Sequence, residues 1–222
     1  MKQGGSEAAK RAAGESAAEA VEDGLVVGLG TGSTTAHAIR PIGRQVDAGL
    51  DIVGVPTSFQ SRELAREAGV PLAELDEVHV DLAIDGADEV AGGDLIKGGG
   101  AAHAREKIVD ASADRFLVVA DPTKEAETLS HPVPVEVLSA ARTTVAASVR
   151  ELGGEPTLRR AERKDGPVVT DNGNLVLDCA FGDIDDPAAL GRALASLPGV
   201  VEHGLFVGLA DEVHVGHEDG VT

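Results

Sequence analysis

The sequence predicts an α/β protein in which a Rossmann-like parallel-sheet domain contains an inserted, ferredoxin-like α+β domain. Two observations lead to this prediction. Over the first 128 residues, short apolar runs that suit buried strands alternate with helical stretches, as in a parallel sheet covered by helices. From about residue 129 the order becomes strand, helix, strand, strand, helix, strand, which is the split βαβ arrangement. We therefore expect one domain over residues 1–128 and 208–222 and the other over 129–207.

The elements of the first domain follow from local signals. Residues 6–21 are rich in Ala and Ser6 is a suitable N-cap, which predicts a helix. The helical stretch after residues 31–35 contains Pro41, which should end or kink its first helix. The remaining patterns predict strands over 25–30, 51–55, 80–84 and 115–120 and helices over 58–68 and 101–111.

The second domain is predicted in the same way. A turn at residues 171–173 precedes one strand, and Pro187 stands at a permitted early position of a helix. The expected elements are strands over 133–137, 155–162, 174–180 and 200–207 and helices over 139–152 and 187–197. Residues 211–215 should form a final strand that returns to the first domain. Cys179, the only cysteine, excludes an internal disulfide and is expected in the core.

Charge limits the possible partners. Among 222 residues, 38 are Asp or Glu and 19 are Lys or Arg, which gives a formal net charge of −19. Such a surface repels nucleic acid and anionic membranes, so we expect neither as a partner. The acid excess and a core with only four Phe and no other aromatic residue resemble proteins adapted to high salt, the alternative being an ordinary acidic protein. No apolar run is long enough to span a membrane and no signal peptide is recognisable, so we expect a cytoplasmic protein.

A glycine-rich loop, Gly28-Leu29-Gly30-Thr31-Gly32-Ser33-Thr34, lies between a predicted strand and a predicted helix. Backbone N–H groups at a helix start bind anions, so the loop suits a small phosphate ester, unless it is merely a tight turn. Ser33 stands where a dinucleotide fingerprint has its third glycine, and the Gly-Lys-Ser/Thr ending of a P-loop is absent.

Two further segments have unusual chemistry. Asp85-Gly86-Ala87-Asp88-Glu89 follows a predicted strand, where sites of open α/β sheets usually form, although acids in loops are often only solvated. Residues 97–107, Lys-Gly-Gly-Gly followed by a helix with Arg-Glu-Lys, bring a cation and backbone amides together. The charged run at 105–107 could instead be an exposed helix face. No spacing indicates a metal site.

Taken together, these segments closely resemble the type A family of ribose-5-phosphate isomerases. The matching stretches are Gly-Thr-Gly-Ser-Thr at 30–34, Asp-Gly-Ala-Asp-Glu at 85–89, Lys-Gly-Gly-Gly at 97–100 and Arg-Glu-Lys at 105–107, with weaker matches over nearly the whole chain. The resemblance implies interconversion of D-ribose 5-phosphate and D-ribulose 5-phosphate through an enediolate, in the non-oxidative pentose phosphate pathway. It further implies no metal or other cofactor, and a homodimer or homotetramer.

The resemblance also implies roles for particular residues. Glu106 would be the proton-shuttling base, and Asp85 and Lys97 would flank the reacting end of the sugar. The substrate-binding residues would be Thr31, Gly32, Ser33, Thr34, Asp85, Gly86, Ala87, Asp88, Lys97, Gly98, Gly99, Gly100, Lys124 and, by a looser match, Lys10. His103 departs from the family pattern. It could perturb the pKa of Glu106 or simply pack.

The residue types suit this chemistry, because one carboxylate can carry a proton between two carbons while a cation and amides stabilise the oxyanion. Two alternatives are a coenzyme A transferase-like enzyme on a related fold and a sugar-phosphate-binding regulatory domain. The first needs a nucleotide-sized cleft, which the short chain does not favour. The second needs a DNA-binding helix pair, and no basic recognition segment is present.

Overall fold

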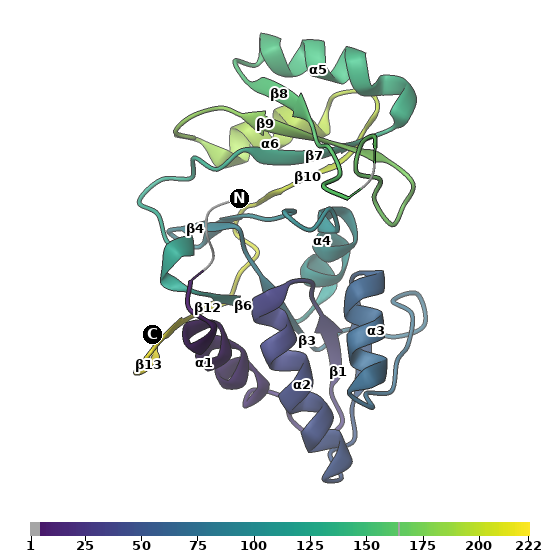
Figure 1. Cartoon of the computed structure of the whole chain (residues 1–222), viewed down its shortest axis with the longest axis vertical. Helices are drawn as coiled ribbons and strands as arrows, with labels where there is room; N and C mark the ends of the chain where they lie inside the picture. Colours follow the sequence, from purple (N-terminus) through teal and green to yellow (C-terminus); the bar gives the residue numbers. More distant parts are fainter. Residues whose placement is uncertain (1–4, 164) are drawn as a thin grey trace. The chain divides into compact units, whose positions relative to one another are not determined.

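The computed structural model describes residues 5–163 and 165–222 and divides into two units (Figure 1). Unit 1 comprises the described residues up to Ala87 together with Arg105–Glu125 and Gly208–Thr222, and unit 2 comprises Asp88–Ala104 and Ala126–Val207. Residues 1–4, part of the segment in which we expect no signal peptide, lie outside this description. No described helix is both long and apolar enough to cross a membrane.

Unit 1 is built on one six-stranded sheet. Its strands, in spatial order, are β13 (Gly220–Val221), β12 (Glu212–His217), β6 (Arg115–Ala120), β3 (Leu82–Gly86), β1 (Val26–Leu29) and β2 (Val53–Pro56). All neighbouring pairs are parallel except β12 with β13. The expected return of the C-terminal segment to the first sheet is therefore confirmed, since β12 pairs with β6.

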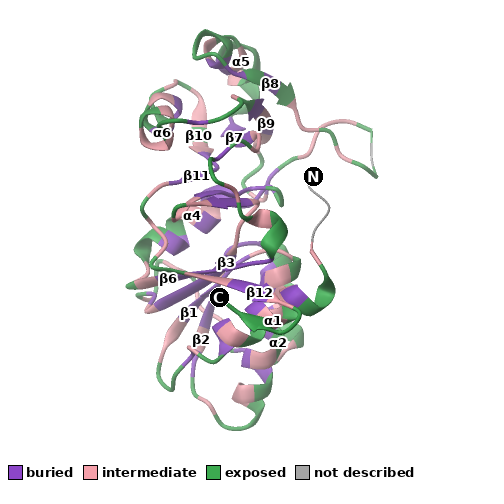
Figure 2. Ribbon diagram, turned by 90° about the vertical axis from the view of Figure 1, so that its left-hand side faces the viewer, coloured by how far each residue is buried: buried purple, intermediate pink, exposed green. Residues whose placement is uncertain are grey.

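Helices cover both faces of this sheet. The helices α1 (Glu7–Ala18), α2 (Ser33–Asp47) and α3 (Phe59–Glu67) share one apolar core with alternate residues of the strands. Strand residues whose side chains point to the opposite face of the sheet pack with Val109 of α4 (His103–Ser112). Burial on both faces explains why the strands are continuous apolar runs, and Figure 2 colours the central strands as buried.

Unit 2 contains two sheets. The larger has the order β10 (Val200–His203), β7 (Val133–Val137), β9 (Leu175–Ala180) and β8 (Glu155–Leu158), with every pair antiparallel. The helices α5 (Arg142–Glu151) and α6 (Pro187–Ala195) follow β7 and β9 in the chain and contribute to its core. The smaller sheet joins β11 (Leu205–Phe206), β5 (Asp94–Ile96) and β4 (Glu89–Ala91). Two short 3₁₀ turns, η1 (Pro122–Lys124) and η2 (Ser139–Ala141), complete the described elements.

The division of the chain differs from the expected 1–128 and 129–207 in residues 126–128, which belong to unit 2, and in one longer segment. Residues 88–104 lie in unit 2, because β4 and β5 pair with β11 from the end of that unit. The expected strand over 200–207 is two strands of different sheets, divided at Gly204. A Cβ at this position would stand 2.1 Å from the carbonyl oxygen of Lys97, so only glycine allows the two backbones to approach so closely.

Other local features differ from or refine the expectation. Pro41, which was expected to end or kink its helix, does not end it, since α2 continues to Asp47 with Ile39, Ile42 and Gly43 buried. The strand expected over 155–162 ends at Leu158. The helix expected from residue 101 begins at His103, since Ala101 adopts a positive φ of 59° that no α-helix accommodates. Ser6 caps α1 as predicted, accepting a hydrogen bond from the Ala9 amide.

Candidate active site

In unit 1, the predicted glycine loop and Asp85 meet at the carboxyl edge of the sheet. The parallel strands β1 and β3 are neighbours, so the loop that follows β1 lies beside Asp85, near the end of β3. The Thr31 amide donates a 3.0 Å hydrogen bond to Oδ1 of Asp85, which also accepts one from the Gly86 amide at 2.6 Å. A Cβ at Gly30 would stand 2.1 Å from this carboxylate. Glycine at position 30 is thus what lets Asp85 approach the loop.

The same loop opens α2. Gly32 has a φ of 132° and is the N-cap, and Ser33 and Thr34 form the first turn, which contains no acidic residue. The hydroxyl of the next residue, Thr35, is buried without a hydrogen-bond partner among the described residues. Since a 15-residue helix directs its free N–H groups and positive dipole end here, the geometry suits an anion.

Two residues that the sequence analysis did not single out extend this site. The Thr31 hydroxyl donates a 2.6 Å hydrogen bond to Oγ of Ser58 and lies 3.0 Å from the Thr57 hydroxyl. Thr57 and Ser58 directly follow β2, the other parallel neighbour of β1. The position after a neighbouring strand was the signal that could have revealed them.

Glu106 and Asp85 are carboxylates withdrawn from solvent. Glu106 is 3% exposed and Asp85 is fully buried. Glu106 lies in the first turn of α4, one turn earlier than the expected helix start would place it. Burial removes competing water, so a carboxylate here can act on a bound substrate. Beside Glu106, the guanidinium of Arg105 lies 5.5 Å from the ring centre of Phe59.

In unit 2, the predicted Lys-Gly-Gly-Gly segment forms a tight loop. Lys97 is 2% exposed, its amide donates to the carbonyl of Gly204 at 2.8 Å, and its Nζ lies 5.3 Å from the ring centre of Phe206. Gly98 has a φ of 109°, and a Cβ there would meet the buried ring of His103 at 2.7 Å. These contacts favour the packing interpretation of His103, because its ring fills the space beside Gly98.

The acidic segment 85–89 is divided between the two units. Asp85 and Gly86 belong to unit 1 with Ala87, whereas Asp88 and Glu89 belong to unit 2. Oδ2 of Asp88 accepts a 2.6 Å hydrogen bond from the Gly99 amide. Glu89 is buried and accepts the amides of Ser130 and His131 at 2.6 and 2.7 Å, which is a structural role. Among the described residues, no group of three or more His, Cys, Asp or Glu could hold a metal ion.

The predicted lysines of unit 1 have acidic neighbours. Lys124 ends η1, which Asp121 caps. Burial by itself would raise the pKa of Asp121. Hydrogen bonds from Thr123 and Gly5, together with the positive charge of Lys124, outweigh this effect and lower the pKa. Lys10 on α1 donates to Glu7 at 2.9 Å. This hydrogen bond, with one from His37, lowers the pKa of Glu7.

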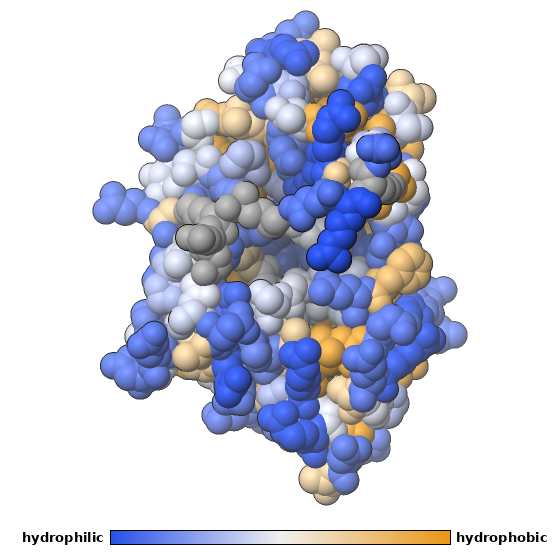
Figure 3. Space-filling view, viewed as in Figure 1, coloured by the Kyte–Doolittle hydropathy of each residue, from blue (hydrophilic) through white to orange (hydrophobic). Residues whose placement is uncertain are grey.

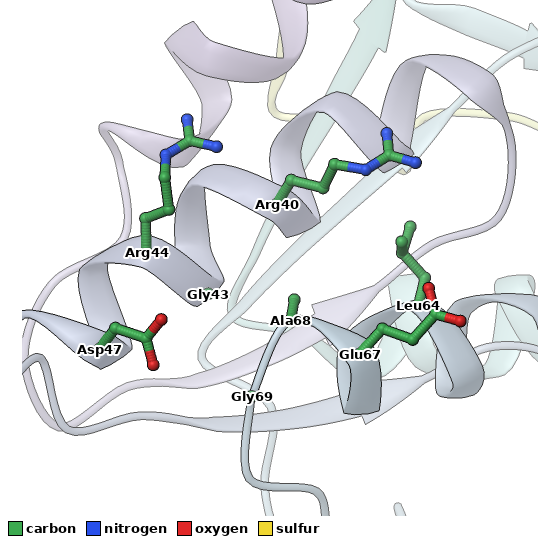
Figure 4. Close-up of a pocket in the computed structure, with 8 residues that line it drawn as sticks. All are labelled: Arg40, Gly43, Arg44, Asp47, Leu64, Glu67, Ala68 and Gly69. Atoms are coloured by element: carbon green, nitrogen blue, oxygen red, sulfur yellow. The ribbon is translucent and has the colours of Figure 1, made fainter.

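A hollow of about 380 Å³ lies elsewhere in unit 1, between α2 and α3 (Figure 4). It is lined by Arg40, Gly43, Arg44, Asp47, Leu64, Glu67, Ala68 and Gly69. None of the predicted site residues contributes to it, so it is separate from the strand-end loops.

In unit 2, burial raises the pKa of the Cys179 thiol to about 12, with the charge of Asp178 contributing. The thiol of this core residue therefore stays protonated.

Comparison with known proteins decides the family. A family model described as ribose 5-phosphate isomerase A (phosphoriboisomerase A) matches residues 53–220. The chain belongs to this family of isomerases. The ribose-5-phosphate isomerase A of Haloarcula marismortui is 81% identical over 222 residues, 100% of this chain and 97% of the relative. The resemblance predicted from the four motifs is confirmed, and a haloarchaeal relative agrees with the predicted adaptation to salt.

Solved structures of the ribose 5-phosphate isomerase A family are also similar. The enzyme from Methanocaldococcus jannaschii has a TM-score of 0.94 at 45% identity, with 97% of each chain covered. A D-ribose-5-phosphate isomerase in complex with phospho-erythronic acid has a TM-score of 0.96 at 44% identity, with 98% of each chain covered. These similarities confirm the α/β fold with a largely parallel sheet.

Proposed function

We propose that this chain interconverts D-ribose 5-phosphate and D-ribulose 5-phosphate, with Glu106 as the base. The observation that carries the proposal is the 81% identity, over the whole chain, to a ribose-5-phosphate isomerase A. The similar enzyme solved with phospho-erythronic acid supports a sugar phosphate as the substrate, because that ligand combines a phosphate with a short polyhydroxy chain. Its carboxylate is also planar and anionic, as an enediolate is.

The proposed reaction moves one proton between two carbons. The Glu106 carboxylate takes the proton from C2 of the open-chain aldose, and the C2–H electron pair forms the C1–C2 double bond while negative charge develops on O1. O1 is protonated and O2 loses its proton, and Glu106 returns its proton to C1 as the carbonyl forms at C2. A positioned base of this kind contributes about 10²–10⁴ in rate. No redox or metal cofactor is required.

The other predicted residues complete this mechanism. Asp85 would assist opening of the furanose ring. Lys97 and the amides of Gly98 and Gly100 would stabilise the developing oxyanion, while Asp88 holds that loop by accepting a hydrogen bond from the Gly99 amide. The remaining binding residues of unit 1 would surround the phosphate and the sugar hydroxyls: Thr31, Gly32, Ser33, Thr34, Gly86, Ala87, Lys124 and Lys10.

We also infer the finer architecture and the setting of the protein. The order of elements in unit 2 and its sheet order β10-β7-β9-β8 support a ferredoxin-like domain for residues 129–207. The parallel sheet of unit 1 supports a Rossmann-like catalytic domain. We further propose a cytoplasmic homodimer or homotetramer.

The test is isomerisation of ribose 5-phosphate by the purified protein in molar KCl, with and without a chelator. Turnover should be equal in both conditions. Glu106→Gln keeps the size of the side chain but removes the base, so kcat should fall by at least about 10² without loss of folded protein. The exposed Glu125→Gln is the matched control and should leave kcat unchanged. Near-parental turnover by Glu106→Gln would exclude Glu106 as the base.

A further inference from the structure

The glycine loop of unit 2 is held by a side chain sixty residues away in the sequence. Nη1 of Arg159 donates hydrogen bonds to the carbonyl oxygens of Gly98 at 2.7 Å and Gly99 at 3.1 Å. Gly98 O also accepts the Ala101 amide at 2.9 Å, which closes the turn. One guanidinium therefore fixes two successive peptide groups of a segment that, with three glycines, has little conformational preference of its own.

The guanidinium is itself held in place. Asp178 on β9 accepts its Nε at 3.2 and 3.0 Å through Oδ1 and Oδ2, and Nη2 also donates to Oδ1. Arg159 directly follows β8, and its amide hydrogen-bonds to the neighbouring strand at Val176 O. The two side chains are only 15% and 30% exposed. Because its planar guanidinium is fixed by hydrogen bonds to β9, Arg159 in turn restrains the loop that it contacts.

The direction of the loop amides follows from the peptide geometry. In a trans peptide the C=O and N–H point in opposite directions, and the described chain has no cis peptide bond. Because Arg159 holds the carbonyls of Gly98 and Gly99, the amides of Gly99 and Gly100 point away from it. The Gly99 amide is taken by Asp88. The Gly100 amide has no hydrogen-bond partner among the described residues, and Gly100 is exposed.

We propose that Arg159, oriented by Asp178, is a positioning residue that aims the Gly100 amide at the developing oxyanion and fixes the backbone that carries Lys97. This inference rests on the proposed isomerase function and goes beyond it, since it assigns a role to a side chain that does not itself act on the substrate. Preorganised donors are worth most when they are directed at the charge of the transition state. Loss of the clamp should therefore lower kcat more than it weakens substrate binding.

The test compares Arg159→Lys and Arg159→Ala with Arg160→Lys. Arg160 is the neighbouring exposed arginine, and its side chain forms no ion pair or hydrogen bond with the described residues. For each variant, kcat and KM for ribose 5-phosphate, the inhibition constant of inorganic phosphate and the melting temperature are measured. We expect kcat per folded molecule to fall about 10–10²-fold in Arg159→Ala and about 10-fold in Arg159→Lys, less than for direct loss of a donor. KM and the phosphate constant should change less than about 3-fold, and Arg160→Lys should match the parent.

The outcomes separate this inference from the proposed function. A parent protein that does not isomerise ribose 5-phosphate would reject the proposed function itself. If the parent is active but both Arg159 variants have the kcat of Arg160→Lys, the positioning role is overturned. It is also overturned if KM and the phosphate constant rise as much as kcat falls, because this indicates general damage. If Arg159→Ala fails to fold, the kcat of Arg159→Lys decides whether the positioning role holds. That variant keeps the positive charge beside Asp178 and loses only the planar, multi-donor geometry of the guanidinium.

Discussion

The two glycine loops proposed to bind the substrate are held by side chains that reach them in different ways. The loop at residues 30–34 of unit 1 is held by side chains that the strand order brings to it: it follows β1, and its hydrogen-bond partners Asp85, Thr57 and Ser58 lie near the end of β3 or directly after β2, the two strands beside β1. The loop at residues 97–100 of unit 2 is fixed by side chains, from Asp88 on one side and Arg159 on the other. The parallel sheet thus places the partners of the first loop at the ends of neighbouring strands, whereas the second loop has partners from separate parts of unit 2, Asp88 near it in the sequence and Arg159 far from it.

The largest expected effect tests the unit 1 loop as the phosphate site. Ribose without its phosphate should be a very poor substrate, because phosphate binding positions the reacting carbons. Three hydrogen bonds to a charged group, at about 1.5–3 kcal/mol each, correspond to a loss of at least about 10³ in kcat/KM. Inorganic phosphate should inhibit competitively. Comparable kcat/KM values for ribose and ribose 5-phosphate would mean that this loop does not bind the phosphate.

The second prediction contrasts one lysine from each unit. Lys97→Ala removes a cation proposed to stabilise the oxyanion, so kcat should fall about 10²–10³-fold while KM changes little. Lys124→Ala removes a proposed substrate contact of unit 1, so KM should rise with little change in kcat. Steady-state kinetics of both variants in the same salt distinguishes the two. An effect of Lys97→Ala on KM alone would make it a binding residue and remove the contrast.

Both loops were predicted from the sequence, but not what holds them. The signals for residues 30–34, 85–89 and 97–107 are local, since glycine runs and charged residues between strand and helix patterns stand out by themselves. Arg159 and Asp178 have no such signal, because an Arg and an Asp nineteen residues apart become neighbours only through the pairing of β8 with β9. The position of residues 88–104 in unit 2 could not be predicted either. The strands β4 and β5 have only three residues each, which is too few for a periodic pattern to be recognised.

The third prediction separates two acids of one motif. Glu89 accepts two backbone amides in unit 2, whereas Asp85 is a proposed catalytic residue of unit 1. Glu89→Gln replaces charge-assisted hydrogen bonds by neutral ones and should lower the free energy of unfolding by about 1–3 kcal/mol. Its kcat should stay within about 2-fold of the parent, and urea unfolding at constant KCl measures the stability. A large loss of kcat with unchanged stability would assign Glu89 to the chemistry.

The smallest expected effect per residue is that of salt on the melting temperature, which depends on which acidic residues are exposed. Of the acidic stretches at 74–77, 81–94 and 183–186, the middle one places Asp85 and Glu89 in the interior, where salt does not screen them. Solvent-exposed acids remain at 74–77 in unit 1 and at 183–186 in unit 2. The mostly hydrophilic face in Figure 3 fits such a surface.

Repulsion within these exposed groups acts over less than the Debye length of about 10 Å at 0.1 M salt, which shrinks to about 3 Å at 1 M. The melting temperature should therefore rise steadily from 0.1 M to above 1 M KCl, with activity retained.

The two groups of exposed acids differ in one respect: Glu74 is paired with Arg62 at 2.7 Å, whereas no cation pairs with Asp183, Asp185 or Asp186 among the described residues. Changing these three residues to Asn should flatten the salt dependence more than changing Glu74, Asp76 and Glu77 to their amides. A melting temperature that is flat or falls across the series in the parent protein would show that neither group destabilises the fold, and equal flattening in both variants would show that the Arg62 pair does not matter.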